Sequence, residues 1–130
     1  MTIRRMFKPI ATVMMLATLL LPMQDASATT VYTGGTVYIG VTRDFETPRT
    51  IYNGGSNIYF ERNAGPEIDF TWYKCSDYLV RGWPVYLGDY QRHFIDGGFM
   101  PGTVFCLAVS SNQYPSPDVF EGWLDWDVYS

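Results

Sequence analysis

Histidine and cysteine, the side chains that most often bind metals or act as catalytic bases and nucleophiles, are scarce in this chain. Its 130 residues include one histidine, His93, and two cysteines, Cys75 and Cys106. A structural zinc site needs about four nitrogen or sulfur ligands, and imidazole-based catalysis would depend on His93 alone. No serine lies in a Gly-x-Ser-x-Gly sequence, and no Asp-x-Asp-x-Asp-Gly calcium loop is present. We therefore predict no enzyme activity, no metal site and no cofactor, with a small hydrolase as the catalytic alternative.

Basic residues are also few, above all in the part of the chain that we expect to fold. The whole chain has nine Lys and Arg against 13 Asp and Glu, a net charge of −4. Removal of residues 1–28 would take away Arg4, Arg5, Lys8 and Asp25, and the six basic and twelve acidic residues left would carry a net charge of −6. Binding to nucleic acid or to an anionic membrane surface needs a basic patch. We expect no nucleic-acid partner.

The hydrophobic run near the N-terminus is too short for a transmembrane helix. It extends over twelve residues from Ile10 to Leu21, and at about 1.5 Å per residue it covers only about 18 Å of a hydrocarbon core of roughly 30 Å. Basic residues precede the run, and the small residues Ala26-Ser27-Ala28 follow it, which is typical of a signal peptide and its cleavage site. We predict a cleaved signal peptide over residues 1–28, a cut between Ala28 and Thr29, and no stable membrane insertion afterwards.

Cleavage would leave residues 29–130 as one exported domain, secreted or associated with the cell envelope. The pair Arg4-Arg5 leaves open whether export uses the general secretory route or the twin-arginine route. In an oxidising compartment two cysteines most simply form one disulfide, so we predict a bond between Cys75 and Cys106. Their separation of 31 positions corresponds to a stabilisation of about 3–4 kcal/mol in the chain-entropy model.

A helical period is absent after Thr29. Gly, Pro and Asn recur every eight to twelve residues, and the runs between them are rich in aromatic and β-branched side chains. This pattern is typical of antiparallel sheet proteins. We predict an all-β fold, namely a small antiparallel β-sandwich or barrel of about seven to eight strands with the one disulfide.

The run Gly102–Ser110 is the predicted central strand. It contains six consecutive apolar residues, which indicates burial on both faces. Cys106 lies in the middle of this run, and we expect its disulfide to cross the core. Apolar and polar residues alternate in Glu67–Trp72 and in Val119–Tyr129, which predicts two strands with one face inward.

Two similar segments, Val31–Tyr38 and Ile51–Tyr59, each place Gly-Gly between residues that favour strands. Because glycine supplies the positive φ of a tight turn, we predict two sister hairpins, and chance resemblance between Tyr- and Gly-rich sequences is the alternative to a true repeat. The polar segment Arg43–Arg49 contains Pro48 and is predicted as a loop. Short strands are predicted at Tyr78–Val80, Val85–Leu87 and Arg92–Ile95.

The last predicted strand offers the best candidate surface. Strict alternation would place Glu121, Trp123, Asp125, Asp127 and Tyr129 on one face, with successive residues about 6.5–7 Å apart. Carboxylates next to exposed aromatic rings can stack on sugars and accept hydrogen bonds from their hydroxyls. We predict a ligand-binding site at Trp123, Asp125, Asp127 and Tyr129, and an ordinary solvated strand face is the alternative.

Ten tyrosines are more than a small core needs, and tyrosine-rich surfaces favour recognition. We therefore predict a secreted, non-enzymatic domain whose partner is an extracellular glycan or protein. The tyrosine-bearing segments Ser76–Trp83 and Asn112–Pro115 are predicted recognition loops. The alternative is a secreted inhibitor or antimicrobial protein that acts through a rigid loop pinned by Cys75. A concavity around Trp123 would favour the glycan, whereas a stiff protruding loop would favour the inhibitor.

Overall fold

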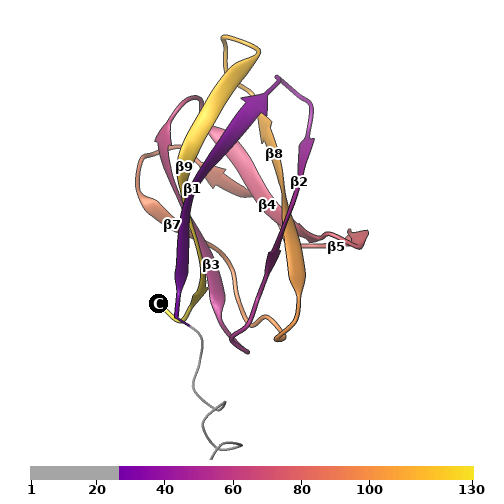
Figure 1. Ribbon diagram of the computed structural model, residues 1–130. Coiled ribbons are helices and arrows are strands. Elements are labelled where there is room, and N and C mark those ends of the chain that lie inside the picture. The colour runs from indigo at the N-terminus through magenta and orange to yellow at the C-terminus, as the bar shows by residue number, and fades with distance from the viewer. Residues whose placement is uncertain (1–26) are drawn as a thin grey trace, which may run out of the picture.

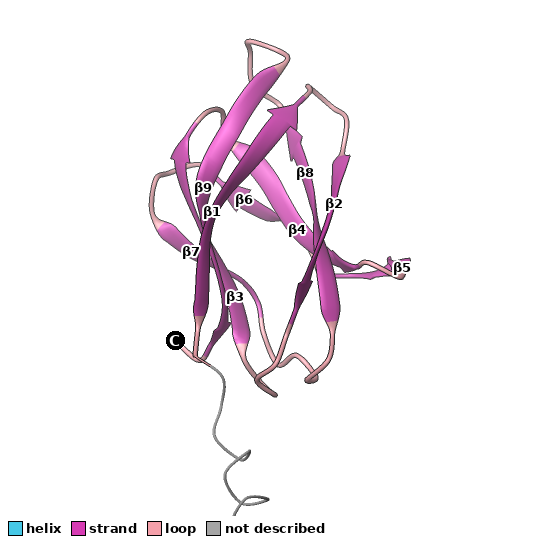
Figure 2. Cartoon of the chain, in the orientation of Figure 1, coloured by secondary structure: helices cyan, strands magenta, loops and turns pink. Residues whose placement is uncertain are grey.

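The computed structural model describes residues 27–130 as two antiparallel sheets that face each other (Figure 1). The predicted all-β class is confirmed, with nine strands in place of the seven to eight expected. Residues 27–130 contain no helix, and hence none long and apolar enough to span a membrane (Figure 2). The predicted signal peptide lies outside the described residues except for its last two, and stays a prediction. Thr29, the expected first mature residue, begins strand β1.

The first layer, called the β9 sheet here, has the strand order β1-β9-β3-β7. Its strands are β1 (Thr29–Val37), β9 (Asp118–Val128), β3 (Asn57–Ala64) and β7 (Arg92–Asp96). The second layer, the β8 sheet, has the order β2-β8-β4-β5, and β6 also pairs with β4. Its strands are β2 (Arg43–Thr50), β8 (Val104–Ser111), β4 (Ile68–Lys74), β5 (Asp77–Arg81) and β6 (Val85–Leu87). All these strand pairs are antiparallel.

Strand β8 lies between β2 and β4, as the prediction of a central strand requires. Phe105, Leu107 and Val109 alternate into the space between the two sheets and are buried there. The intervening Cys106 and Ala108 face outward and are nevertheless buried, because Tyr73 of the neighbouring strand covers them. The apolar run is therefore buried on both faces, as predicted, but only one face belongs to the core between the sheets.

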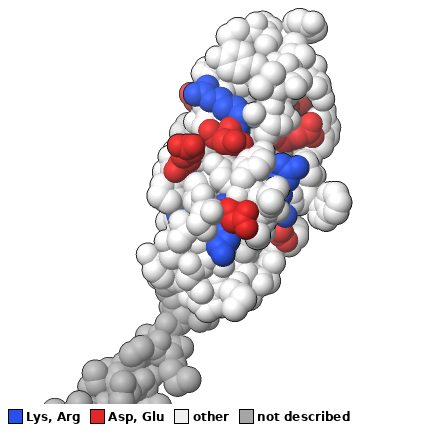
Figure 3. Space-filling view, turned by 90° about the vertical axis from the view of Figure 1, so that its right-hand side faces the viewer, with Lys and Arg blue, Asp and Glu red and all other residues white. Residues whose placement is uncertain are grey.

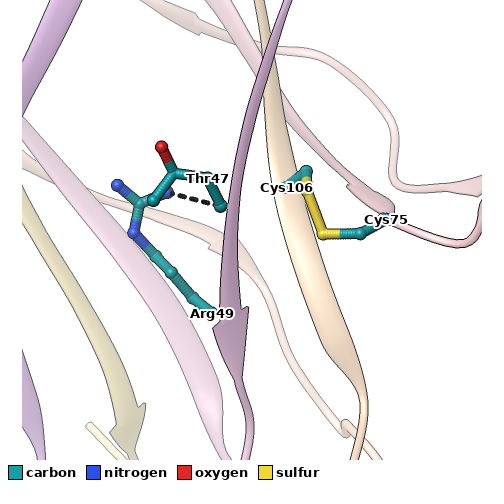
Figure 4. Close-up of a disulfide and its surroundings, with 4 residues drawn as sticks. All are labelled: Thr47, Arg49, Cys75 and Cys106. Atoms are coloured by element: carbon teal, nitrogen blue, oxygen red, sulfur yellow. Dashed lines mark hydrogen bonds between the residues drawn. A yellow bond between two sulfur atoms is a disulfide. The ribbon is translucent and has the colours of Figure 1, made fainter.

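The disulfide between Cys75 and Cys106 is confirmed, with Cα atoms 5.2 Å apart. It does not cross the core, contrary to our expectation. Cys106 points outward because it has the opposite parity to Phe105, and Cys75 directly follows the end of the adjacent strand β4. The bond therefore joins two neighbours within the β8 sheet on its outer face, while Arg49 of β2 extends on the opposite side of the sheet (Figure 4). Disulfides persist in oxidising compartments, so this bond indicates such an environment for the folded chain.

The two predicted Gly-Gly hairpins are wrong. Gly34 and Gly35 lie inside the single strand β1, where a Cβ on Gly34 would be 2.0 Å from the Phe120 carbonyl oxygen and one on Gly35 would be 2.2 Å from the Phe45 ring. These glycines permit close approach of neighbouring groups and make no turn. The second pair does make a turn, with φ of 77° at Gly55, but that turn connects β2 in one sheet to β3 in the other.

The predicted loop Arg43–Arg49 is also wrong, because these residues form most of strand β2. Pro48 fits there for two reasons. β2 is an edge strand that pairs only with β8, and its register with β8 shifts between Phe45 and Arg49. Edge strands and irregular pairings are the places in a sheet where the missing N–H of proline costs little.

Candidate functional site

The predicted site on the last strand is divided between two places. The expected alternation holds from Phe120 to Trp126 and fails at Asp127, which is only 3 % exposed and has a φ of 60°. The register with β3 shifts at this point, so β9 carries a bulge that turns the carboxylate inward. Asp127 Oδ1 accepts hydrogen bonds from the backbone N–H groups of Tyr52 (2.8 Å) and Asn53 (3.0 Å). This carboxylate therefore holds the connection between β2 and β3.

Tyr129 lies near Asp127, beside the connection between β2 and β3, where its hydroxyl donates to the Gly54 carbonyl at 3.1 Å. Trp123 and Asp125 remain on the outer face of the β9 sheet. Asp125 forms an ion pair with Arg92 at 3.0 Å. The Trp123 ring packs edge-on against Tyr32, with centroids 4.8 Å apart, and 43 % of the residue is exposed. Only two of the four predicted residues thus share a surface, and the carboxylate among them already has a cationic partner.

A shallow hollow of about 310 Å³ lies beside this surface, above Gly34 and Gly35 of β1. Tyr32 and Glu121 form part of its wall, and the Tyr32 hydroxyl donates to Glu121 Oε2 at 3.0 Å. Asn63 Nδ2 donates to the same hydroxyl at 3.2 Å. These polar groups satisfy one another, which leaves Trp123 as the main exposed aromatic group on the predicted face.

A larger hollow, of about 450 Å³, lies on the outer face of the β8 sheet over the disulfide. We call it the disulfide groove, and it is lined by Asp44, Glu46, Tyr73, Cys75, Tyr78 and Cys106. The small side chain of Cys106 leaves depth between strand β2 and the β4–β5 hairpin. On the side of the molecule where β2 and β5 lie, charged side chains gather around the middle and the two ends are uncharged (Figure 3). The volume is within the range of about 300–1,000 Å³ typical of ligand pockets.

The groove is acidic, and its carboxylates are not neutralised by the protein itself. Within residues 27–130, the side-chain carboxylates of Asp44 and Glu46 form no ion pair and accept no hydrogen bond from another residue. Tyr73 of β4, which pairs with Cys106 of β8, also lines the groove and is 5 % exposed. Burial raises the pKa of the Tyr73 phenol, and the negative charges of Asp44 and Glu46 raise it further because they disfavour a phenolate.

One wall of the groove is the β4–β5 hairpin, which leaves the body of the sandwich (Figure 1). All five residues of β5 are exposed. The register between β4 and β5 shifts after Tyr73, so the residues from Tyr78 to Val80 bulge outward. We call Tyr78, Leu79 and Val80 the hairpin tip. Leu79 is 89 % exposed, and so is Trp83, which follows the hairpin directly after Gly82.

The base of the protruding segment 76–81 is fixed on both sides. Cys75, in the two-residue turn between β4 and β5, is held by the disulfide, and its backbone N–H donates to the Val104 carbonyl at 3.1 Å. On the returning strand, the Gly82 N–H donates to the Trp72 carbonyl at 3.0 Å, and the Gly82 carbonyl accepts from Thr71 Oγ1 at 2.9 Å. The predicted recognition loop Ser76–Trp83 is therefore largely strand β5 of an anchored hairpin with an apolar tip, and the short strand predicted at Tyr78–Val80 lies within β5.

His93 pairs with Asp89, with 2.6 Å between Nε2 and Oδ1. The hydrogen bond from His93 lowers the pKa of the Asp89 carboxyl. No group of three or more His, Cys, Asp or Glu side chains within the described part of the chain could hold a metal ion.

Sequence reasoning missed the carboxylates of the groove because it treated residues 43–49 as a loop. The alternation Asp44-Phe45-Glu46 was the available signal, since Phe45 packs against the core while its two neighbours face outward. No protein-family model matches this chain, and no curated protein matches its sequence at a significant level. The function therefore has to be argued from geometry.

Proposed function

We propose that this protein is an exported, non-enzymatic domain that binds another protein through the β4–β5 hairpin. The observation that carries this proposal is the exposure of Leu79 in the bulge of an anchored hairpin and of Trp83 directly after it. Clustered, exposed apolar side chains mark interaction surfaces. Burial of each large apolar side chain in an interface contributes about 1.5–3 kcal/mol.

Rigidity of the hairpin adds to its fitness as a binding element. A disulfide and three backbone-linked hydrogen bonds hold its base, so little conformational freedom is lost when the tip docks. The bond itself suits an oxidising compartment, and the signal-like sequence of residues 1–28 supports export to the cell envelope or the extracellular space.

An inhibitor or antimicrobial protein is the second candidate, because preformed loops that change little on binding are typical of protease inhibitors. Both candidates use the same hairpin to bind a protein, and they differ only in whether the bound partner is inactivated. A glycan receptor has less support. Asp127 is buried, Asp125 is paired with Arg92, and Trp123 stands without a second predicted residue that is free to bind a sugar hydroxyl.

The proposal can be tested by affinity capture from culture supernatant and from solubilised cell envelope. The bait proteins are the wild type, the double variant Leu79→Ser/Trp83→Ser and the control Met100→Ser, which alters another exposed apolar residue, 76 % exposed, in the β7–β8 connection. We expect one protein partner to be retained by the wild type and the control and lost by the double variant. Equal capture by the double variant, or retention of purified polysaccharide alone, would refute the hairpin as the binding element.

A further inference from the structure

We propose that the disulfide groove receives an arginine side chain of the protein that docks on the hairpin tip. This inference rests on the proposed function and names the chemistry of the partner. It is carried by two independent features of the groove within residues 27–130: a pair of carboxylates without a cationic partner, and a tyrosine that is only 5 % exposed and whose hydroxyl, open to the groove, has no hydrogen-bond partner in the protein.

The carboxylates of Asp44 and Glu46 remain unpaired because the basic residues on their own strand point elsewhere. Arg43 donates to the Thr36 carbonyl at 3.0 Å and lies over the Phe45 ring. Arg49 extends to the other side of the sheet, where it donates to the Thr47 carbonyl at 3.3 Å (Figure 4). Two outward carboxylates on one wall of a hollow favour a cation supplied from outside.

The Tyr73 hydroxyl gives the second indication. Tyr73 is 5 % exposed and lines the groove, yet its hydroxyl makes no hydrogen bond to any residue between 27 and 130. The hydroxyl is open to the groove, where a ligand N–H can donate to its oxygen. A donor placed there lies in the same hollow as the two carboxylates.

The aromatic walls favour arginine over lysine. The rings of Tyr73 and Tyr78 lie 5.0 Å apart at 60° to each other, and Arg81 already places its guanidinium 5.3 Å from the Tyr78 ring centre while donating to the Tyr78 hydroxyl. A planar guanidinium stacks on aromatic faces and offers several N–H donors in fixed directions, whereas an ammonium does neither.

The hairpin tip and the groove are continuous, so one partner can occupy both. Tyr78 belongs to the tip and also lines the groove, and Cys75 forms both the base of the hairpin and part of the groove lining. A protein that covers Leu79 therefore lies next to the groove. A basic side chain at the edge of that contact would enter it.

The test uses N-acetyl-arginine methylamide as the probe and its citrulline analogue, which has nearly the same shape but no charge, as the control. Each is titrated into the purified ¹⁵N-labelled protein and followed by amide chemical shifts. We expect saturable shifts at residues 44–46, 73–78 and 105–107 with the arginine probe only. A matching response to citrulline, shifts outside the groove, or no saturable shift would overturn the inference.

Charge variants make the same test specific. Asp44→Asn/Glu46→Gln should weaken binding of the arginine probe at least tenfold, whereas Glu61→Gln/Asp118→Asn, which changes the net charge equally on the other sheet, should leave it unchanged. Equal loss in both variants would overturn the inference. If the arginine probe does not bind but partner capture still requires Leu79 and Trp83, only the inference about the groove is refuted. If the probe binds but partner capture is unaffected by the Leu79/Trp83 variant, only the proposed role of the hairpin is refuted.

Discussion

Replacement of both cysteines by alanine, Cys75→Ala/Cys106→Ala, removes the one covalent link between β8 and the hairpin. The closed loop spans 31 positions, for which the chain-entropy model gives a loss of about 3.7 kcal/mol of stability at 25 °C. In a domain of this size each kcal/mol corresponds to about 4–8 °C, so we expect the melting temperature to fall by about 15–30 °C. The loss should arise mainly from the greater freedom of the unfolded chain.

Urea unfolding, followed by tryptophan fluorescence, measures this loss for the double variant and for the reduced wild type. Both should give the same free energy of unfolding within about 1 kcal/mol, because alanine at the outward Cys106 removes little packing beyond the sulfur itself. Wild type in oxidising buffer is the reference. A loss below about 1 kcal/mol would contradict the entropic account, since it would mean that the unfolded chain is already compact without the bond.

The position of the bond predicts where the native state loosens. Since the core between the sheets does not include the disulfide, amide exchange in β9 and β3 should follow the global stability alone. Exchange in residues 76–81 should accelerate beyond that, because the hairpin keeps only the backbone hydrogen bonds at its base. Uniform acceleration across both sheets would contradict a local anchoring role.

Two further perturbations test single side chains. Asp127→Ala removes the acceptor of two backbone hydrogen bonds, each of which contributes about 1.5–3 kcal/mol because the acceptor is charged. The variant also removes the buried Oδ2, which has no partner within residues 27–130. We therefore expect the free energy of unfolding in urea to fall by about 2–4 kcal/mol. Asp127→Asn keeps an acceptor and tolerates the positive φ, so it should cost less than half as much; equal costs would contradict this role. Tyr73→Phe should remove one late-titrating phenol from the alkaline ultraviolet titration. Asp44→Asn/Glu46→Gln should lower the pKa of the Tyr73 phenol toward its ordinary value. The pKa should stay above that value, because burial, the larger cause of the shift, remains. If the titration of Tyr73 is the same in this variant as in the wild type, the carboxylates of Asp44 and Glu46 are too far from the phenol to raise its pKa.

The raised pKa of Tyr73 also sets the sign of a pH effect on stability. The unfolded chain loses this proton at a lower pH than the folded chain, so the stability associated with the neutral phenol is complete below the ordinary tyrosine pKa. It is lost as the pH rises through the folded value. Comparison of wild type with Tyr73→Phe at alkaline pH isolates this contribution, and the variant should lose less stability there.

The fold could be predicted where burial alone sets the pattern. The apolar run of β8 and the alternation of β9 from Phe120 to Trp126 each correspond to a strand in the centre of its sheet. The glycines were misread because a local sequence cannot distinguish a positive φ from close approach. Gly34 lies against Phe120, which is far away in sequence, and Gly35 against Phe45 of the opposite sheet.

The candidate site was predicted poorly for a related reason. Alternation places a side chain on a face only while the register is kept, and the bulge at Asp127 depends on backbone N–H groups contributed by Tyr52 and Asn53. The disulfide groove depends on four strands, β2, β4, β5 and β8, that meet only in the folded sheet. Nothing in the sequence near Asp44 indicates that Tyr73 and Cys106 lie beside it.

The same disulfide contributes to both halves of the proposed interface, and this explains why one bond on the outer face can matter more for binding than for the core. A side chain larger than Cys106 would fill the groove at this position. The bond from Cys106 to Cys75 also fixes the hairpin that forms the opposite wall. Reduction would therefore release the tip and widen the groove together, while Phe105 and Leu107 still pack between the sheets. Binding through both surfaces should be lost under reducing conditions in which the sandwich itself remains folded.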